Sequence, residues 1–191
     1  MDNSTFYVSS KLVAVSNTGP LLSAFQCGRV DLLQCYLAVI HIPQSELMEF
    51  ERHNAGEEIR SLIAEGFVVV HHLGSEECIK AEELAKDIAA SVQARVKEFE
   101  HHLPEAEAMV LMRRPELGCE VLLVEEKAAR EVARELKLEI TGFVGIVAKA
   151  ISEGIITTKE ARRLLEVCRQ KGTRYSDALI EWAQEYGRER R

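Results

Sequence analysis

Acidic residues follow apolar runs or prolines at several points in this chain, where a helix is expected to begin. They are Glu49, Glu105, Glu107, Glu125 and Glu126. Carboxylates gathered at one place repel one another, so such a cluster is kept mainly where a hard divalent cation neutralises it. Mg²⁺ and Mn²⁺ suit oxygen-rich sites and serve the hydrolysis of phosphodiesters. The chemistry to consider is therefore metal-dependent cleavage of a nucleic acid.

Taken one at a time, these residues have plainer interpretations. Glu105 and Glu107 fall in the first turn behind Pro104, where carboxylates complement the helix dipole. Glu49 lies in the helical segment behind Pro43 and suits a solvated helix face. Only the convergence of several carboxylates on one edge favours a metal site.

The segment VAVSNTGPL, residues 13–21, places a polar break after the first apolar run. It predicts a strand that runs into a turn, with a helix beginning near Pro20. In an open sheet of parallel strands, ligands bind at such an edge. Asn17 is therefore either a turn residue and helix cap or one wall of an active site.

Strand-like and helix-like segments alternate along the chain. Strand patterns cover residues 11–15, 38–42, 67–73, 120–124 and 138–141. Helical patterns cover residues 20–27, 30–37, 44–53, 56–66, 75–101, 105–114, 126–136, 142–154, 158–170 and 175–187. Pro43 and Pro104 are expected to open their helices, and Gly66 to close one.

This alternation predicts an α/β fold, a three-layer α/β/α sandwich around a central parallel sheet of four to five strands. Right-handed crossovers place every strand-to-helix turn on one edge of the sheet. If the first and fourth strands are neighbours, Ser16 and Asn17 face Glu125 and Glu126 across a crevice at that edge.

Composition is typical of a chain that buries a core and has no general affinity for nucleic acid. The chain has 191 residues, 47% of them hydrophobic, and a net charge of −7 from 24 basic and 31 acidic side chains. Arg113 and Arg114 could still meet phosphates, whereas the tail cluster 188–191 suits a solvated end.

The five cysteines are odd in number and lack CxxC spacing, which argues against zinc ribbons and disulfide frameworks. Residues 1–10 are polar and no run could span a bilayer, so we expect no signal peptide and a cytoplasmic protein.

Histidines and the single tryptophan also have structural interpretations. His71 and His72 are adjacent on a strand, so they point to opposite faces and cannot share a zinc ion. His101 and His102 lie near a helix end, where they suit the dipole and the free carbonyls. Trp182 has helical spacing with apolar neighbours, which is typical of a packed face within the chain or against a second subunit. An exposed face of this kind predicts a homodimer.

The order of several short motifs resembles that of the PIN domains, a family of small metal-dependent nucleases. The strand end SNTxPL appears as SNTGPL, and GRxDLL is complete in residues 28–33. The element iPxxVxxE appears as IPQSELME, and GEAEA appears as PEAEA. The motifs LLiDDxxAR and VTGTxGiLxxAkxxGxI appear as LLVEEKAAR and ITGFVGIVAKAISEGII. The resemblance covers about residues 11–160 and is closest to a prokaryotic branch related to toxins of the VapC type.

The resemblance implies a metal site whose first acidic position falls on Asn17. Glu49 and Glu105 match the second and third acidic positions, and Glu126 matches the fourth, with Glu125 as the other half of the pair. The implied activity is hydrolysis of single-stranded RNA with Mg²⁺ or Mn²⁺, with Glu49, Glu105 and Glu126 as the catalytic residues.

The resemblance also implies a supporting or substrate-binding role for the hydroxyl of Thr18. Lys127 and Arg130 are candidates for contacting the RNA phosphates, although ordinary surface charge on a helix is their plainer interpretation. A small antitoxin protein is the partner that the toxin branch implies. Residues 11–160 would form the nuclease domain, and residues 161–191 a helical extension packed on it or at a dimer interface.

Two departures from the family pattern bear on activity. Asn17 offers a neutral oxygen in place of a carboxylate, and the pair Glu125–Glu126 replaces two aspartates. Both changes weaken precise octahedral coordination of Mg²⁺ and favour a slower enzyme or one that prefers Mn²⁺. The alternative is a catalytically weakened module that binds nucleic acid or protein. A receiver-type domain is a third interpretation, but it requires an acidic pair after the first strand.

Overall fold

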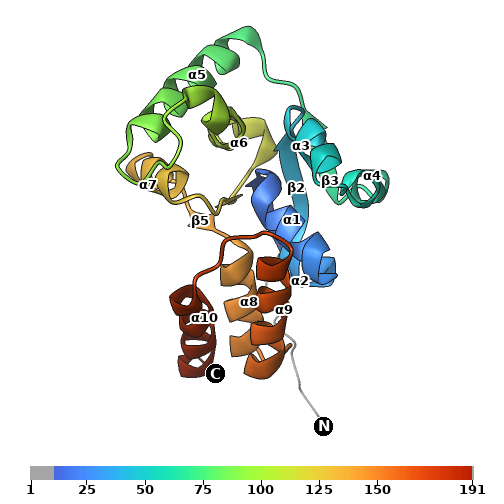
Figure 1. The fold of residues 1–191 in the computed structure, drawn as a ribbon. Helices are drawn as coiled ribbons and strands as arrows, with labels where there is room; N and C mark the ends of the chain where they lie inside the picture. Colours follow the sequence, from blue (N-terminus) through green and yellow to red (C-terminus); the bar gives the residue numbers. More distant parts are fainter. Residues whose placement is uncertain (1–10, 191) are drawn as a thin grey trace.

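The computed structural model describes residues 11–190, and residues 1–10, where we expect no signal peptide, lie outside them (Figure 1). Five strands form one parallel sheet in the order β3-β2-β1-β4-β5. They are β1 (Leu12–Ser16), β2 (Leu37–Pro43), β3 (Val68–His71), β4 (Val121–Leu123) and β5 (Ile140–Thr141). Ser16 pairs in register with Leu123, so the predicted pairing of the first and fourth strands is confirmed.

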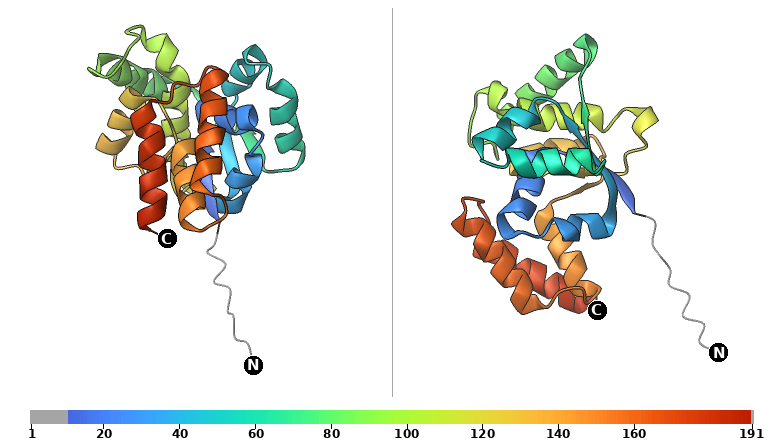
Figure 2. Two further views of the ribbon diagram at one scale, coloured as in Figure 1. Left: turned by 60° about the horizontal axis from the view of Figure 1, so that its bottom comes forward. Right: turned by 90° about the vertical axis from the view of Figure 1, so that its right-hand side faces the viewer.

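Helices cover both faces of this sheet, which confirms the predicted three-layer sandwich (Figure 2). The α-helices are α1 (Thr18–Cys27), α2 (Val30–Tyr36), α3 (Glu46–Arg52), α4 (Gly56–Ala64), α5 (Ser75–Ala90), α6 (Leu103–Leu111), α7 (Lys127–Glu135), α8 (Phe143–Ser152), α9 (Thr158–Gln170) and α10 (Asp177–Glu189). Two short 3₁₀ turns are η1 (Phe99–His102) and η2 (Pro115–Leu117). Within residues 11–190, no helix has the length and apolar character needed to cross a membrane.

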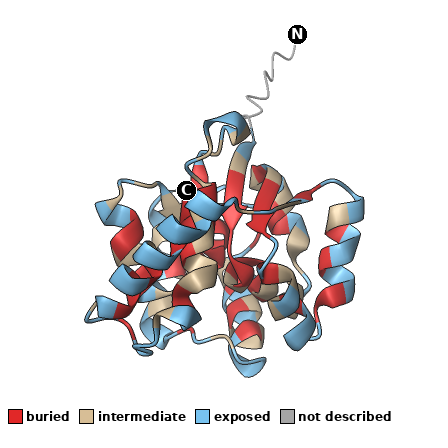
Figure 3. Ribbon diagram, turned by 90° about the horizontal axis from the view of Figure 1, so that it is seen from above, coloured by how far each residue is buried: buried red, intermediate tan, exposed pale blue. Residues whose placement is uncertain are grey.

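Two cores lie on the two sides of the sheet because successive strand residues point to opposite faces. Val15 and Leu122 are fully buried against α5, α6 and α7. Ala14 and Leu123 are fully buried on the other face, with α1 to α4 and α8 to α10. The strands are therefore buried at the centre, while the helices expose their outer faces (Figure 3).

Helix starts differ from the sequence predictions near two prolines. Pro43 is the last residue of β2 and α3 begins only at Glu46, so the expectation that Pro43 opens a helix is wrong. The end of β2 tolerates this proline because its pairing with β1 stops at His41, while the next residue, Gln44, still donates its N–H to the His71 carbonyl oxygen of β3 at 2.9 Å. Helix α1 begins at Thr18, two residues before Pro20.

The long helix predicted for residues 75–101 ends at Ala90. The Lys97 ammonium donates to the carbonyl oxygens of Ala89 at 3.2 Å and Ser91 at 2.7 Å. The chain thus turns back and satisfies carbonyls that the end of a helix leaves free. A local pattern rich in good helix formers does not reveal such a return, because propensity is a weak constraint against it.

The last two helices pack against the sheet domain through α8 and α1. Ala161, Leu165 and Ile180 are buried in the same core as Ala14. Figure 1 shows α8, α9 and α10 side by side. Close approach of α10 to α8 requires Gly187, because a Cβ atom there would lie 2.5 Å from Ile151 Cβ and 3.0 Å from the Ala148 carbonyl oxygen.

The substitution Gly187→Ala tests this contact. We expect it to lower the free energy of unfolding by about 1–3 kcal/mol because the added methyl overpacks the interface. At a solvent-facing helix position the same change would stabilise by up to about 1 kcal/mol. Urea denaturation measures the sign. Glu185→Ala, at an exposed position of the same helix, is the control and should stay within about 0.5 kcal/mol of the wild type.

Candidate functional site

Asn17 follows β1 and precedes α1, but its side chain does not cap that helix. Its Nδ2 atom donates to Glu105 Oε1 at 3.0 Å. The residue is only 6% exposed, and its Oδ1 atom has no hydrogen-bond partner in the described chain. The side chain therefore connects the end of β1 to the first turn of α6, which is a role beyond that of a turn residue.

A second group of side chains gathers next to this contact. His102 precedes α6, Glu105 lies in the first turn of α6, and Glu126 lies just before α7. One ligand atom from each of these residues lies within 4.8 Å of the other two. His102 Nδ1 is 3.3 Å from Glu126 Oε2. The edge where β1 and β4 end thus collects groups from two helix starts.

Thr18 brings two further carboxyl groups to the same edge. Its backbone N–H donates to Glu46 Oε2 at 2.8 Å. Its hydroxyl contacts the same oxygen and lies 3.0 Å from Glu49 Oε2. A hydroxyl has one proton and cannot donate to two carboxylates at once, so both contacts are satisfied when Glu46 is protonated.

Burial makes this edge a costly place for negative charge. It raises the pKa of Glu46 well above its ordinary value, and the charges of Glu49 and Glu105 act in the same direction. Burial likewise raises the pKa of Glu105 to about 7, with further contributions from Glu126 and Glu49. Glu46 and Glu105 therefore keep their protons to higher pH than ordinary carboxyl groups do.

Unpartnered oxygens test whether a divalent cation fits here. Asn17 Oδ1, Glu46 Oε1 and Glu105 Oε2 are all shielded from solvent and lack hydrogen-bond partners. A buried oxygen without a partner is destabilising, so most such atoms in proteins are satisfied. Oxygen donors are the ligands that Mg²⁺ and Mn²⁺ prefer. The donor set therefore fits a divalent cation.

Glu125 makes its hydrogen bonds with residues outside the group formed by His102, Glu105 and Glu126. Glu125 Oε1 accepts hydrogen bonds from the Tyr175 hydroxyl at 2.7 Å and the Phe143 N–H at 3.1 Å. Burial raises the pKa of Glu125. Of the acidic pair, Glu126 alone belongs to the group of three, and the expected ligand role of Glu125 has no support in these contacts.

The predicted substrate-binding residues have different surroundings. Thr18 is 2% exposed and engaged with Glu46 and Glu49, so it positions carboxylates. The Arg130 guanidinium donates to the Val124 carbonyl oxygen at 2.7 Å and is half-buried. Lys127 is exposed at the start of α7, beside Glu126. Only Lys127 is free to meet a phosphate at the surface.

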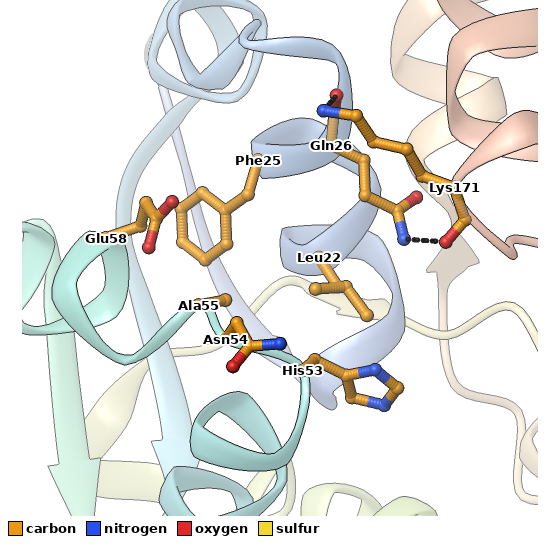
Figure 4. A pocket seen from close by; sticks show the side chains of 8 residues that line it. All are labelled: Leu22, Phe25, Gln26, His53, Asn54, Ala55, Glu58 and Lys171. Atoms are coloured by element: carbon orange, nitrogen blue, oxygen red, sulfur yellow. Dashed lines mark hydrogen bonds between the residues drawn. The ribbon is translucent and has the colours of Figure 1, made fainter.

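A pocket of about 210 Å³ lies elsewhere, between α1, the turn that joins α3 to α4, and the end of α9 (Figure 4). Phe25, His53 and Lys171 are among the residues that line it. The Gln26 amide closes its rim by donating to the Lys171 carbonyl oxygen at 3.3 Å. None of the carboxylates described above lines this pocket, but it adjoins the acidic edge, because His53 Nε2 lies 3.9 Å from Glu49 Oε1.

Sequence patterning missed three residues of the site and its surroundings. Glu46 lies three residues before Glu49, and His102 three residues before Glu105. Residues at that spacing share one helix face, which is the signal that could have found Glu46. His102 is only 3% exposed and faces Glu126, whereas we had expected a role at a helix end. Tyr175 carries no local signal, because its partner lies 50 residues away.

The fold and this edge define an α/β/α domain with a partly buried acidic group at the carboxyl ends of its central strands. A family model described as a PIN domain matches residues 13–186, so the chain belongs to the PIN domain family. The family is one of nucleases that generally use divalent metal ions. No curated protein and no solved structure matches the chain.

The raised pKa of Glu105 predicts a pH-dependent stability of the metal-free protein. The folded state keeps a proton that the unfolded chain, with an ordinary pKa of 4.5, releases at lower pH. The contribution of this group therefore destabilises the fold progressively as pH rises from about 4.5 to 7. Glu105→Gln removes that contribution, and its oxygen can still accept from Asn17.

We expect Glu105→Gln to gain about 1–3 kcal/mol over the wild type between pH 5 and pH 8. Urea unfolding in EDTA at both pH values measures the difference. Glu100→Gln, at an exposed position in η1, is the control and should run parallel to the wild type. Parallel curves for Glu105→Gln as well would show that Glu105 titrates normally.

Proposed function

We propose that this protein is a ribonuclease that uses Mg²⁺ or Mn²⁺ to hydrolyse single-stranded RNA in the cytoplasm. The observation that carries the proposal is the convergence of Glu46, Glu49, Glu105 and Glu126 on one edge, with shielded oxygens that lack partners. Membership of the PIN domain family supports nuclease activity. The choice of RNA rests on the resemblance of the motifs.

The proposed mechanism assigns a task to each residue of the edge. Glu49, Glu105 and Glu126 would hold the cation, with the free Oδ1 of Asn17 as a neutral ligand. The chemistry supplied by a bound Mg²⁺ or Mn²⁺ is polarisation of a phosphoryl oxygen and a hydroxide nucleophile at neutral pH.

Two other residues assist without holding the ion. Thr18 keeps Glu46 and Glu49 in place through its hydroxyl and backbone N–H. Lys127 offers an exposed ammonium next to Glu126, where it can neutralise charge that builds on the phosphate during cleavage.

A catalytically weakened binding module is the second candidate. Two observations favour it: the amide of Asn17 is hydrogen-bonded to Glu105, and Glu125 lies in a separate network with Tyr175. The site therefore has fewer converging charges than the paired acidic motif suggests. Binding of RNA without cleavage would support this candidate.

We further propose a role as the toxin of a toxin–antitoxin pair, with a small antitoxin protein as partner. The resemblance to toxin-like PIN domains supports this role. The proposed homodimer has weaker support, because Ile180 is buried in the core of its own chain and Leu179 packs against it. Of the apolar residues on which we based the dimer, Trp182 is the one that stays exposed, at 44%, and could contact a second subunit. A monomeric mass in light scattering would contradict the dimer.

Cleavage of a mixed single-stranded RNA tests the enzyme directly. We expect products with Mn²⁺ or Mg²⁺ and none with EDTA. Glu126→Gln should reduce the rate about 100-fold or more because it removes a charged ligand. Glu135→Gln, exposed at the end of α7, is the matched control and should cleave like the wild type. RNA binding by the wild type without metal-dependent products would leave the binding module as the function.

Asn17 occupies the first acidic position of the family pattern. Restoring a negative charge there distinguishes a role as metal ligand from a purely structural role. Asn17→Asp removes the donor to Glu105 and places two carboxylates together, so the metal-free variant should melt lower than the wild type. With the cation bound, the added ligand charge should strengthen affinity by about tenfold to a hundredfold. Melting curves with EDTA and with excess Mn²⁺ measure both effects. Equal metal-induced shifts in the two proteins would assign Asn17 a purely structural role.

A further inference from the structure

The ring of His102 is held in a defined orientation between two acceptors. His102 Nε2 lies 3.0 Å from the Val96 carbonyl oxygen, which can only accept a hydrogen bond. The hydrogen of the neutral ring therefore sits on Nε2, and Nδ1 presents its lone pair. Metal-binding histidines are held in this way, with one ring N–H donated to a backbone carbonyl and the other nitrogen free for the ion.

The lone pair of Nδ1 points at another acceptor. Glu126 Oε2 is 3.3 Å away, and a ligand atom of Glu105 completes a group within 4.8 Å. Glu105 Oε2 is shielded from solvent and has no hydrogen-bond partner. Two acceptors at this distance need a proton or a cation between them. Neighbouring ligands of an octahedral ion with bonds of about 2.1 Å lie about 3 Å apart, which matches this separation.

We infer that His102 is a nitrogen ligand of the proposed metal site, together with Glu105 and Glu126, so that the site takes Mn²⁺ in preference to Mg²⁺. The inference shares its location with the proposed function and assigns the ligand set there. Imidazole nitrogen is a ligand for first-row transition metals, whereas Mg²⁺ selects oxygen. Glu105 joins this nitrogen ligand to Asn17, whose Nδ2 donates to Glu105 Oε1 at 3.0 Å and which stands where the family pattern has a carboxylate.

Electron spin-echo spectroscopy of bound Mn²⁺ tests the inference because it detects a coordinated nitrogen nucleus. We expect modulation from nitrogen-14 in the wild type and its loss in His102→Gln. The glutamine amide can still reach the Val96 carbonyl from the Nε2 side while the Nδ1 ligand is gone. His101→Gln, exposed one residue earlier, is the matched control and should keep the signal.

Calorimetric titration of the metal-free protein measures its selectivity for Mn²⁺ over Mg²⁺. His102→Gln should weaken Mn²⁺ binding by about tenfold or more while changing Mg²⁺ binding by less than about threefold. Absence of Mn²⁺ binding, or bound Mn²⁺ without nitrogen modulation in the wild type, overturns the inference. Modulation that persists in His102→Gln also overturns it, and would point to the other close pair, His41 and His71, whose ring nitrogens are 2.8 Å apart.

These measurements separate the inference from the proposed function. Nitrogen-coordinated Mn²⁺ in a protein that cleaves no RNA supports the ligand role of His102 and contradicts the proposed ribonuclease activity. RNA cleavage with Mn²⁺ bound by oxygen alone supports the proposed ribonuclease activity and contradicts the ligand role of His102.

Discussion

The hydrogen bond from Asn17 to Glu105 holds together two segments that are 88 residues apart in the chain. It joins the end of the central strand β1 to the first turn of α6, and the other carboxyl groups of the site are arranged around it. An aspartate at position 17 would repel Glu105, whereas the amide binds it. Asparagine therefore stabilises the metal-free site relative to aspartate, and under the proposed function it offers the cation a neutral oxygen in place of a charged one.

Glu46 supplies a carboxyl group to the edge that lacks one at position 17. It stands where the motif iPxxVxxE has valine, and it places a fully buried carboxyl group against Thr18. The edge therefore holds Glu46, Glu49, Glu105 and Glu126, the same number of carboxyl groups as a site with aspartate at position 17. Glu46 thus places a carboxyl group at the start of α3 in place of one at the end of β1, and burial raises its pKa well above the ordinary value.

Much of the fold followed from the sequence because its signals are local. Continuous apolar runs such as VLLV mark strands that are buried on both faces, and their alternation with helices fixes a parallel sheet. The predicted start of α3 and the predicted end of α5 were wrong because contacts between segments decide where these helices begin and end. One example is the pair of hydrogen bonds from Lys97 to the carbonyl oxygens of Ala89 and Ser91. In the site, Glu105 and Glu126 were predicted from their positions at helix starts. The ring orientation of His102 depends on a carbonyl of the irregular segment before η1, and no local pattern reveals it.

The hydrogen bond between Tyr175 and Glu125 has a consequence for how the chain can vary. Tyr175 lies in the connection between α9 and α10, and Glu125 is the covalent neighbour of Glu126. The last two helices thereby help to fix the backbone from which Glu126 projects. We therefore expect α9 and α10 to accept fewer substitutions across related proteins than helices of similar exposure that have no such link.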